Sequence, residues 1–322
     1  MLLNFGVNSI RHGGQQPVPC RKVAAPGRRA RAAAAFVGAG VLLAGCTTNS
    51  EIGAPTGDGV VEVAVDKVDA IAAQLPAKNA ESGTLVVGVN LPYAPNEFKD
   101  SDGEIIGFDV DLIDAVADVL GVTPDYREAD FERIIPAVQA DTYDLGMSSF
   151  TDTKEREESV DFVTYFNAGV QWAQAAGDSV DPDNACGLSV SVQTTTIEDI
   201  EEVPAKSAAC VAAGKPPIQK VKFDSQDEAA SAVVLGKVDA MSADSPVTAF
   251  AIKRSNGSLE TAGPVFDAAP YGWPVAKGSP IASVLQKALQ HLIDDGTYQT
   301  IAENWGVEEG VIATSQINGA TS

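Results

Sequence analysis

The sequence alternates twice between short apolar runs and amphipathic segments of helical period, and this alternation constrains the fold more than any other feature. The first round predicts strands at 84–90, 122–127 and 145–149, with helices at 107–120 and 131–140. The second round follows Asn184 and predicts strands at 188–192, 218–223 and 240–242, with helices at 197–212, 227–235 and 246–253. We therefore expect two α/β lobes with mainly parallel sheets, in which ligands bind at the carboxyl ends of the strands.

Segments before, between and after the two rounds of alternation complete the expected architecture. Apolar residues at helical spacing between positions 61 and 75 predict a leading helix that Pro76 ends. Residues 168–175 and 271–275 are expected to be extended, and an apolar stripe at 281–293 predicts a long amphipathic helix.

Composition and charge exclude several classes of function. The chain has two histidines, His12 and His291, and no Cys/His cluster with metal spacing, so a zinc site is not expected. The acidic stretch 100–104 lacks the acid that a calcium loop requires five positions before its glycine, because Phe98 stands there. The first 45 residues carry six basic charges and no acidic ones, and the remainder holds 16 basic against 44 acidic residues, or −28. Such a surface repels phosphates, so we expect no nucleic-acid partner.

The N-terminal region is predicted to be an export signal. An apolar run at 32–44 follows three arginines and is shorter than the roughly 20 residues that a membrane-spanning helix needs. The run ends in Leu43-Ala44-Gly45-Cys46, which resembles a bacterial lipobox. We therefore expect residues 1–45 to be a lipoprotein signal peptide and Cys46 to carry the lipid, at the outer face of the cell membrane. An ordinary signal peptide with a chance cysteine is the alternative.

The four cysteines allow three pairings. Cys20 lies in the predicted signal and Cys46 in the predicted lipidation site, which leaves Cys186 and Cys210. An exported protein reaches a compartment that permits disulfides, so these two are expected to pair. Two buried free thiols are the alternative.

The catalytic motifs that sequence can recognise are absent. The chain holds no nucleophile elbow, Walker loop, dinucleotide fingerprint or zinc-protease motif. His291 lies within the last amphipathic stripe, where a surface position is expected. We therefore expect neither an enzyme nor a resident cofactor.

Three groups of segments carry a resemblance to a known family. They are 88–95 (GVNLPYAP) with 107–112 (GFDVDL), 135–139 (IPAVQ) with 143–156 (YDLGMSSFTDTKER) and 160–162 (VDF), and 192–196 (VQTTT) with 238–244 (VDAMSAD). Together they resemble the extracellular solute-binding proteins that serve polar amino-acid ABC importers, over residues 83–305.

The resemblance implies a two-lobed, type II periplasmic-binding-protein-like α/β fold with two crossover hinge strands. Its expected parts are a lipid tether and leading helix at 46–83, lobe 1 at 84–170 plus 264–305, lobe 2 at 171–263, and a C-terminal tail at 306–322. A free amino acid would be captured by hinge closure and delivered to ABC permease subunits in the membrane, with the protein acting as a monomer. A dehydratase of an aromatic amino-acid precursor on the same fold is the alternative.

The resemblance also implies ligand-binding residues. Arg156, in the Thr-x-x-Arg motif, matches the residue that grips the ligand α-carboxylate, which suits the planar guanidinium fork. Asp244 matches the acid that binds the α-ammonium. Supporting positions are Ser149 and Thr151 at a strand end, and Thr195 and Thr196 at a helix N-terminus. Three alternatives stay open: a solvated ion pair for Arg156, and helix N-caps for Asp244 and Thr196.

The expected side-chain pocket is aromatic. Tyr93 and Phe131 match the residues that sandwich the ligand side chain, although each could equally be core. Asn90 is an expected ligand-binding residue at a position where relatives that bind basic amino acids often have an acid. This departure argues against a lysine, arginine or histidine ligand, unless Glu97 substitutes for that acid.

Overall fold

The computed structural model of the chain describes residues 61 and 63–321. The predicted signal peptide, Cys20, Cys46 and most of the predicted tether lie outside the described residues.

Lobe 1 is built on a parallel three-stranded sheet in the order β4-β1-β5. Its elements are β1 (Thr84–Val89), the hairpin of β2 (Phe98–Lys99) and β3 (Ile105–Ile106), α3 (Phe108–Leu120), β4 (Thr123–Glu128), α4 (Phe131–Gln139), β5 (Leu145–Gly146), α5 (Lys154–Glu157), α9 (Ile281–Asp295) and α10 (Thr297–Trp305). Helix α3 buries its apolar stripe in one core with α9 and ends at Gly121, whose φ of 68° is the left-handed conformation that glycine adopts readily.

Lobe 2 is built on the parallel strands β7, β8 and β9, with β7 in the middle. Its elements are η1 (Pro182–Asn184), β7 (Ser189–Gln193), η2 (Glu198–Glu202), α6 (Val203–Ala212), β8 (Gln219–Phe223), α7 (Gln226–Val234), β9 (Ala240–Asp244) and α8 (Ser245–Arg254). The predicted disulfide joins Cys186, just before β7, to Cys210 in α6, with their Cα atoms 5.5 Å apart. This lobe therefore repeats the strand–helix alternation that the sequence predicts.

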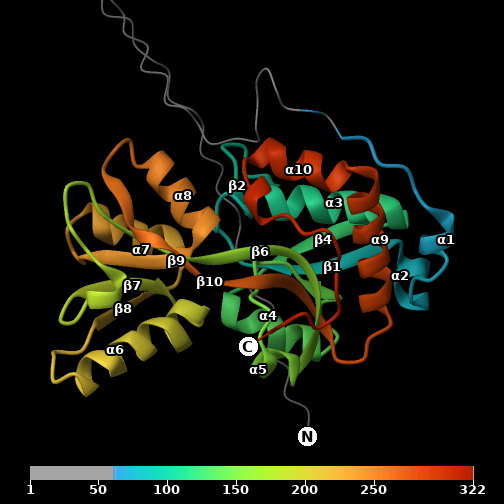
Figure 1. Ribbon diagram of the computed structural model, residues 1–322. Coiled ribbons are helices and arrows are strands. Elements are labelled where there is room, and N and C mark those ends of the chain that lie inside the picture. The colour runs from blue at the N-terminus through green and yellow to red at the C-terminus, as the bar shows by residue number, and fades with distance from the viewer. Residues whose placement is uncertain (1–60, 62, 322) are drawn as a thin grey trace, which may run out of the picture. The chain divides into compact units, whose positions relative to one another are not determined.

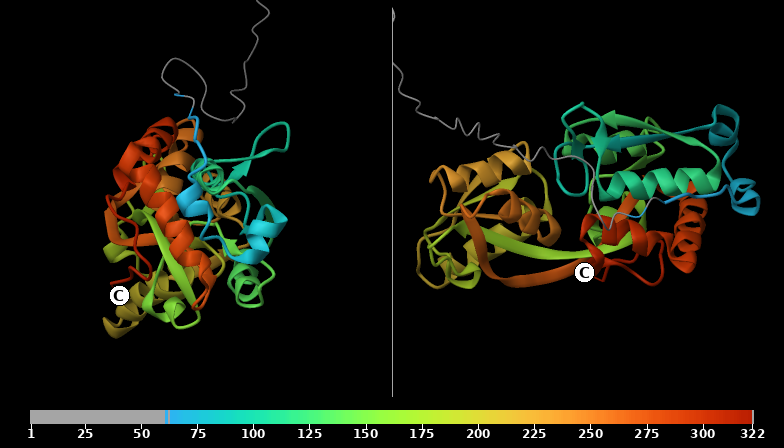
Figure 2. Two further views of the ribbon diagram at one scale, coloured as in Figure 1. Left: turned by 90° about the vertical axis from the view of Figure 1, so that its right-hand side faces the viewer. Right: turned by 90° about the horizontal axis from the view of Figure 1, so that it is seen from above.

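Two long antiparallel strands run through both lobes, as Figure 1 shows and as the view from above in Figure 2 repeats. They are β6 (Val160–Ala175) and β10 (Leu259–Ala276). One half of the pair packs in the lobe 1 core through Tyr165 and Trp273, and the other half packs in lobe 2 through Trp172. The predicted two-lobed α/β fold with two crossover strands is thereby confirmed.

The leading helix predicted for residues 61–75 is wrong. Only α1 (Asp69–Ala72) is helical there, and α2 (Ala77–Ser82) lies beyond the proline. Val63 and Val65 pack against the lobe 1 core from a segment without regular structure. Valines at alternate positions suit extended chain, since branching at Cβ restricts χ1 and lowers helix propensity. Packing against lobe 1 therefore decided this conformation.

The C-terminal segment returns to the crossover strands instead of leaving the domain. After η3 (Glu308–Gly310), the Gln316 carbonyl accepts a hydrogen bond from the Thr164 amide at 2.9 Å. Further along, the Gly319 amide donates to Asp152 at 2.7 Å. The segment thus contacts both β6 and the loop that precedes α5.

Candidate functional site

Strand ends from both lobes meet around one narrow cavity. Asn90 follows β1, Thr151 follows β5, Gln193 ends β7 and Asp244 ends β9, and all four line the cavity. The space between its lining side chains, including the open solvent at its mouth, is about 300 Å³. Every predicted ligand-binding residue except Thr195 lines it. This is the position expected for a ligand site in parallel sheets, beyond the carboxyl ends of the strands.

Arg156 is held in place by backbone carbonyls. The Thr153 hydroxyl caps α5 by accepting a hydrogen bond from the Arg156 amide at 3.2 Å. The guanidinium donates to the Thr151 carbonyl at 2.8 Å and, from lobe 1 to lobe 2, to the Thr195 carbonyl at 3.4 Å. Within the described chain Arg156 forms no ion pair, so the alternative of a solvated surface pair is wrong.

Two aromatic rings support this guanidinium. Phe131 and Phe150 stack with their ring centroids 4.4 Å apart, and the Arg156 Cζ lies 6.0 Å and 5.8 Å from these centroids. Burial in this environment lowers the pKa of Arg156 from its usual value. A half-buried guanidinium that forms no ion pair among the described residues can bind an incoming carboxylate.

Asp244 faces the cavity from lobe 2. Asp244 occupies the N-cap position of α8, as that alternative expects, but its carboxylate makes no side-chain capping bond to the helix. Instead it accepts a hydrogen bond from the Tyr93 hydroxyl of lobe 1 at 2.5 Å. Burial, and next the Glu198 carboxylate, raise the pKa of Asp244 well above its usual range. A cation placed between these groups would restore the charged form of Asp244.

A second contact between the lobes engages Asn90. The Gln193 amide donates to the Asn90 Oδ1 at 2.8 Å, and the Asn90 Nδ2 donates to the Ala129 carbonyl at 2.9 Å. Both ends of the Asn90 amide are thus bonded to protein. Asn90 lines the cavity while joining the two lobes.

The threonines after β7 differ in orientation. Thr195 has a positive φ of 64°, its amide donates to Asp199, and its hydroxyl donates to the Thr194 carbonyl. Thr196 lines the cavity, and its hydroxyl also donates to the Gln193 carbonyl at 2.9 Å. Its Oγ1 also accepts from the Asp199 amide at 3.4 Å, so both the capping and the cavity-facing positions predicted for Thr196 are observed.

Sequence reasoning missed several residues that line the cavity: Ser148, Gln193, Ile197 and Glu198. Glu198 is the most consequential, since it is only 2% exposed and its Oε1 has no hydrogen-bond partner among the described residues. It opens an acidic run that is typical of a solvated helix face. Its position directly after the Thr-Thr-Thr-Ile strand-end segment was the available clue.

A buried layer of acids lies behind the two serines of the site. The Ser148 hydroxyl donates to Glu97 at 2.9 Å, and the Ser149 hydroxyl donates to Asp109 at 3.3 Å. Burial raises the pKa of Glu97 well above its usual value and that of Asp109 to about 6. Glu97 does not line the cavity.

Residues 61 and 63–321 contain no group of His, Cys, Asp and Glu side chains placed to hold a metal ion. They also contain no helix long and apolar enough to cross a membrane. His291 on α9 is partly exposed, 3.6 Å from Asp295, as the sequence predicts.

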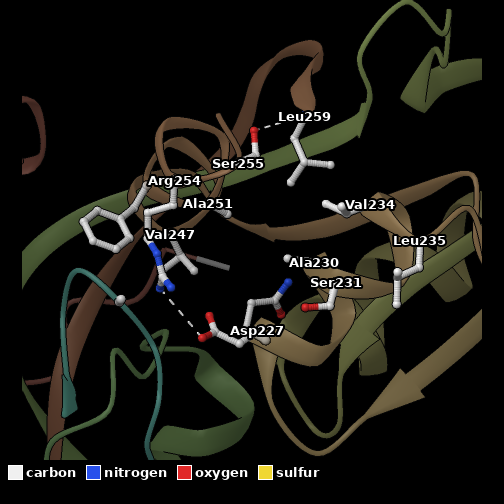
Figure 3. A pocket seen from close by; sticks show the side chains of 13 residues that line it. Asp227, Ala230, Ser231, Val234, Leu235, Val247, Ala251, Arg254, Ser255 and Leu259 are labelled. Carbon is white, nitrogen blue, oxygen red and sulfur yellow. Dashed lines mark hydrogen bonds and ion pairs between the residues drawn. The ribbon is translucent and has the colours of Figure 1, made fainter. Parts of the chain in front are cut away.

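A larger and more open hollow of about 860 Å³ lies between α7 and α8, where Figure 3 shows its lining side chains. Most of these are apolar, including Val234, Leu235 and Val247. Its charged residues, Asp227 and Arg254, face one another at 3.8 Å. Because these charges are already paired, this hollow lacks the separated cation and anion found at Arg156 and Asp244.

Comparison with known proteins agrees with this geometry. An arginine-binding protein, ArgT, from Corynebacterium glutamicum is 45% identical over 91% of this chain and 96% of its own length. A glutamine-binding protein of an ABC transporter, GlnH from Bacillus subtilis, is 29% identical over 65% of this chain and 76% of its own. A solved ancestral arginine-binding protein bound to arginine matches with a TM-score of 0.64 and 35% identity, over 69% of this chain and 98% of that one.

The family model for bacterial extracellular solute-binding proteins, family 3, matches residues 85–308. This range contains every strand except the first residue of β1, and it includes both crossover strands and every residue that lines the cavity. The chain therefore belongs to the bacterial extracellular solute-binding proteins of family 3.

Proposed function

We propose that this protein captures a free α-amino acid between its lobes and delivers it to an ABC importer. One observation carries the proposal: Arg156 from lobe 1 and Asp244 from lobe 2 face a single cavity, and neither is ion-paired among the described residues. A free amino acid presents one carboxylate and one ammonium, and desolvating both requires such partners.

Residues that line the cavity are assigned roles toward the ligand. Arg156 binds the α-carboxylate, supported by Thr151, Ser149 and Thr196. Asp244 binds the α-ammonium. Tyr93 and Phe131, which line the cavity, hold the ligand side chain between their rings. Asn90 contributes by linking the lobes through Gln193.

Arginine is the proposed ligand. The relative from Corynebacterium glutamicum that spans nearly the whole chain is named for arginine, and so is the ancestral protein in the solved complex. The neutral Asn90 does not count against a basic ligand, because its amide is bonded to Gln193 and Ala129. Other residues that line the cavity are therefore proposed to recognise the side chain of the ligand.

Capture is proposed to proceed by hinge closure about β6 and β10. The contacts Tyr93–Asp244, Gln193–Asn90 and Arg156–Thr195 each join one lobe to the other. A ligand that pairs with Arg156 and Asp244 adds further bonds across the same boundary and so favours the closed arrangement. The closed form is the one proposed to dock on the permease.

The protein is proposed to work outside the cell membrane, held there by lipid on Cys46. The family to which it belongs is extracellular, and the segment Leu43-Ala44-Gly45-Cys46 follows an apolar run behind basic residues. Metabolic labelling with palmitate tests the anchor. Label that persists in a Cys46→Ala protein would contradict it.

A thermal-shift screen of the twenty amino acids tests ligand identity. A ligand at 100 times its dissociation constant stabilises the folded state by about 2.7 kcal/mol. We expect arginine to give the largest shift, and calorimetry then gives its affinity. A screen in which no amino acid shifts the melting temperature would contradict the proposed function.

A further inference from the structure

We propose that Glu198 is the residue that makes this site select an amino acid with a positively charged side chain. The inference rests on the proposed function, since it assumes that Arg156 and Asp244 take the two α-groups. It assigns the carboxylate of Glu198 to the side chain of the ligand.

Glu198 is held within the cavity wall by its place in the chain. It opens the η2 segment, which runs from Glu198 to Glu202 directly after the strand-end threonines. The exposed fraction of Glu198 is 2%, whereas its neighbour Glu201 is exposed. Glu198 lines the cavity, and its buried Oε1 has no hydrogen-bond partner among the described residues.

Glu198 forms no ion pair among the described residues. The charge of Arg156 acts to lower the pKa of Glu198, but burial outweighs it and the pKa is raised overall. Arg156 itself is engaged by the carbonyls of Thr151 and Thr195, and two lysines of this lobe, Lys220 and Lys222, pair with Asp199. A buried carboxylate with neither a counter-charge nor a full set of hydrogen bonds is costly.

The charges that line the cavity are therefore unbalanced. Arg156 is the positive side chain of this lining, and Asp244 and Glu198 are the negative ones. The α-carboxylate and α-ammonium of any amino acid satisfy Arg156 and Asp244. A neutral ligand side chain leaves Glu198 unpaired, whereas a cationic one restores neutrality within the desolvated site.

The surrounding groups reinforce this preference. The negative charge of Glu198, together with burial, makes ionisation of Asp244 unfavourable and raises its pKa. Both acids line the cavity, so their negative charge opposes entry of an additional anion. A ligand with a second carboxylate, such as glutamate, is the class that this arrangement rejects most strongly.

The test compares arginine with citrulline, whose uncharged ureido group has nearly the shape of the guanidinium. Calorimetry measures both ligands on the wild type, on Glu198→Gln and on Glu201→Gln as a matched control on the same segment. We expect Glu198→Gln to weaken arginine binding at least ~10-fold while citrulline changes by less than about threefold. Glu201 is exposed, and its charge acts on Arg156, which would meet the same α-carboxylate in both ligands. Glu201→Gln should therefore leave the ratio of arginine to citrulline affinity unchanged.

A further variant separates charge from packing. Glu198→Asp keeps the negative charge, so it should retain the preference for arginine over citrulline even if both affinities fall. Equal losses of arginine and citrulline in Glu198→Gln would show a structural role and overturn the inference, as would unchanged affinities for both. Should the wild type bind neither compound nor any other amino acid, the proposed function itself fails, which is a distinct outcome.

Discussion

The Tyr93 hydroxyl of lobe 1 donates a hydrogen bond to the Asp244 carboxylate of lobe 2, at 2.5 Å across the ligand cavity. The acid proposed to bind the ligand ammonium is therefore oriented by the opposite lobe. This bond exists only when the lobes are close, so it couples the orientation of Asp244 to closure. The acid should be best placed for the ammonium in the closed form.

Replacing Tyr93 with Phe removes this bond and keeps the ring. Hydrogen bonds to charged groups contribute about 1.5–3 kcal/mol, so amino-acid affinity should fall by roughly tenfold or more while the fold persists. Calorimetry measures the loss. Tyr126→Phe is the control, because the Tyr126 hydroxyl bonds Asp114 away from the cavity. Unchanged affinity in Tyr93→Phe would mean that the bond does not orient Asp244.

Removing either charged anchor should have larger effects. Truncating one partner of a desolvated charge contact typically costs about 2–5 kcal/mol, so Arg156→Ala should abolish tight binding and Asp244→Ala should weaken binding and closure. Circular dichroism should show folded protein in both cases. Arg133→Ala removes an exposed ion pair with Asp130 and should bind normally. If both folded anchor variants bind within about threefold of the wild type, the assigned pocket is wrong.

The disulfide should stabilise lobe 2 without contributing to the site. Cys186 and Cys210 are 24 positions apart, and neither lines the cavity. Their double replacement by serine should lower the free energy of unfolding by about 3 kcal/mol and leave ligand affinity unchanged, measured by denaturant unfolding and calorimetry. Non-reducing mass spectrometry of the native protein should find no free thiol at these positions, and two free thiols would refute the bridge.

Glu202 should make stability depend on pH. It accepts hydrogen bonds from Trp172 at 3.2 Å and from Ser242 at 3.1 Å, and burial raises its pKa to about 7. Because its pKa is higher in the folded than in the unfolded chain, the unfolded state releases this proton first, and stability is lost as pH rises from about 4.5 to 7.

Glu202→Gln tests this effect because the amide stays neutral at every pH. The variant should resemble the wild type in free energy of unfolding near pH 4.5 and exceed it above pH 7 by about 3 kcal/mol, as the raised pKa implies. Urea unfolding at a series of pH values measures both curves. Parallel curves for variant and wild type would contradict the assignment of this pH dependence to Glu202.

The alternation of strands and helices, and with it the two-lobed fold, follows from local patterns in the sequence. Strand periodicity and amphipathic stripes are local, so β1, α3 and α9 could be located from residue spacing alone. The same patterns could not locate the segment around Val63 and Val65, where packing against lobe 1 outweighed helical spacing. Arg156 was recognisable from its Thr-x-x-Arg motif, which opens α5, and Asp244 from the motif that ends at β9.

Which of these side chains are paired and which are not depends on contacts that form only in the folded chain. Tyr93 and Asp244 are 151 positions apart in the sequence, and Asn90 and Gln193 are 103 positions apart. Neither contact between the lobes could therefore be derived from residue spacing. Glu198 looked like one acid among several on a solvated helix. Its burial depends on how lobe 2 turns the start of that helix toward the cavity, which no local pattern encodes.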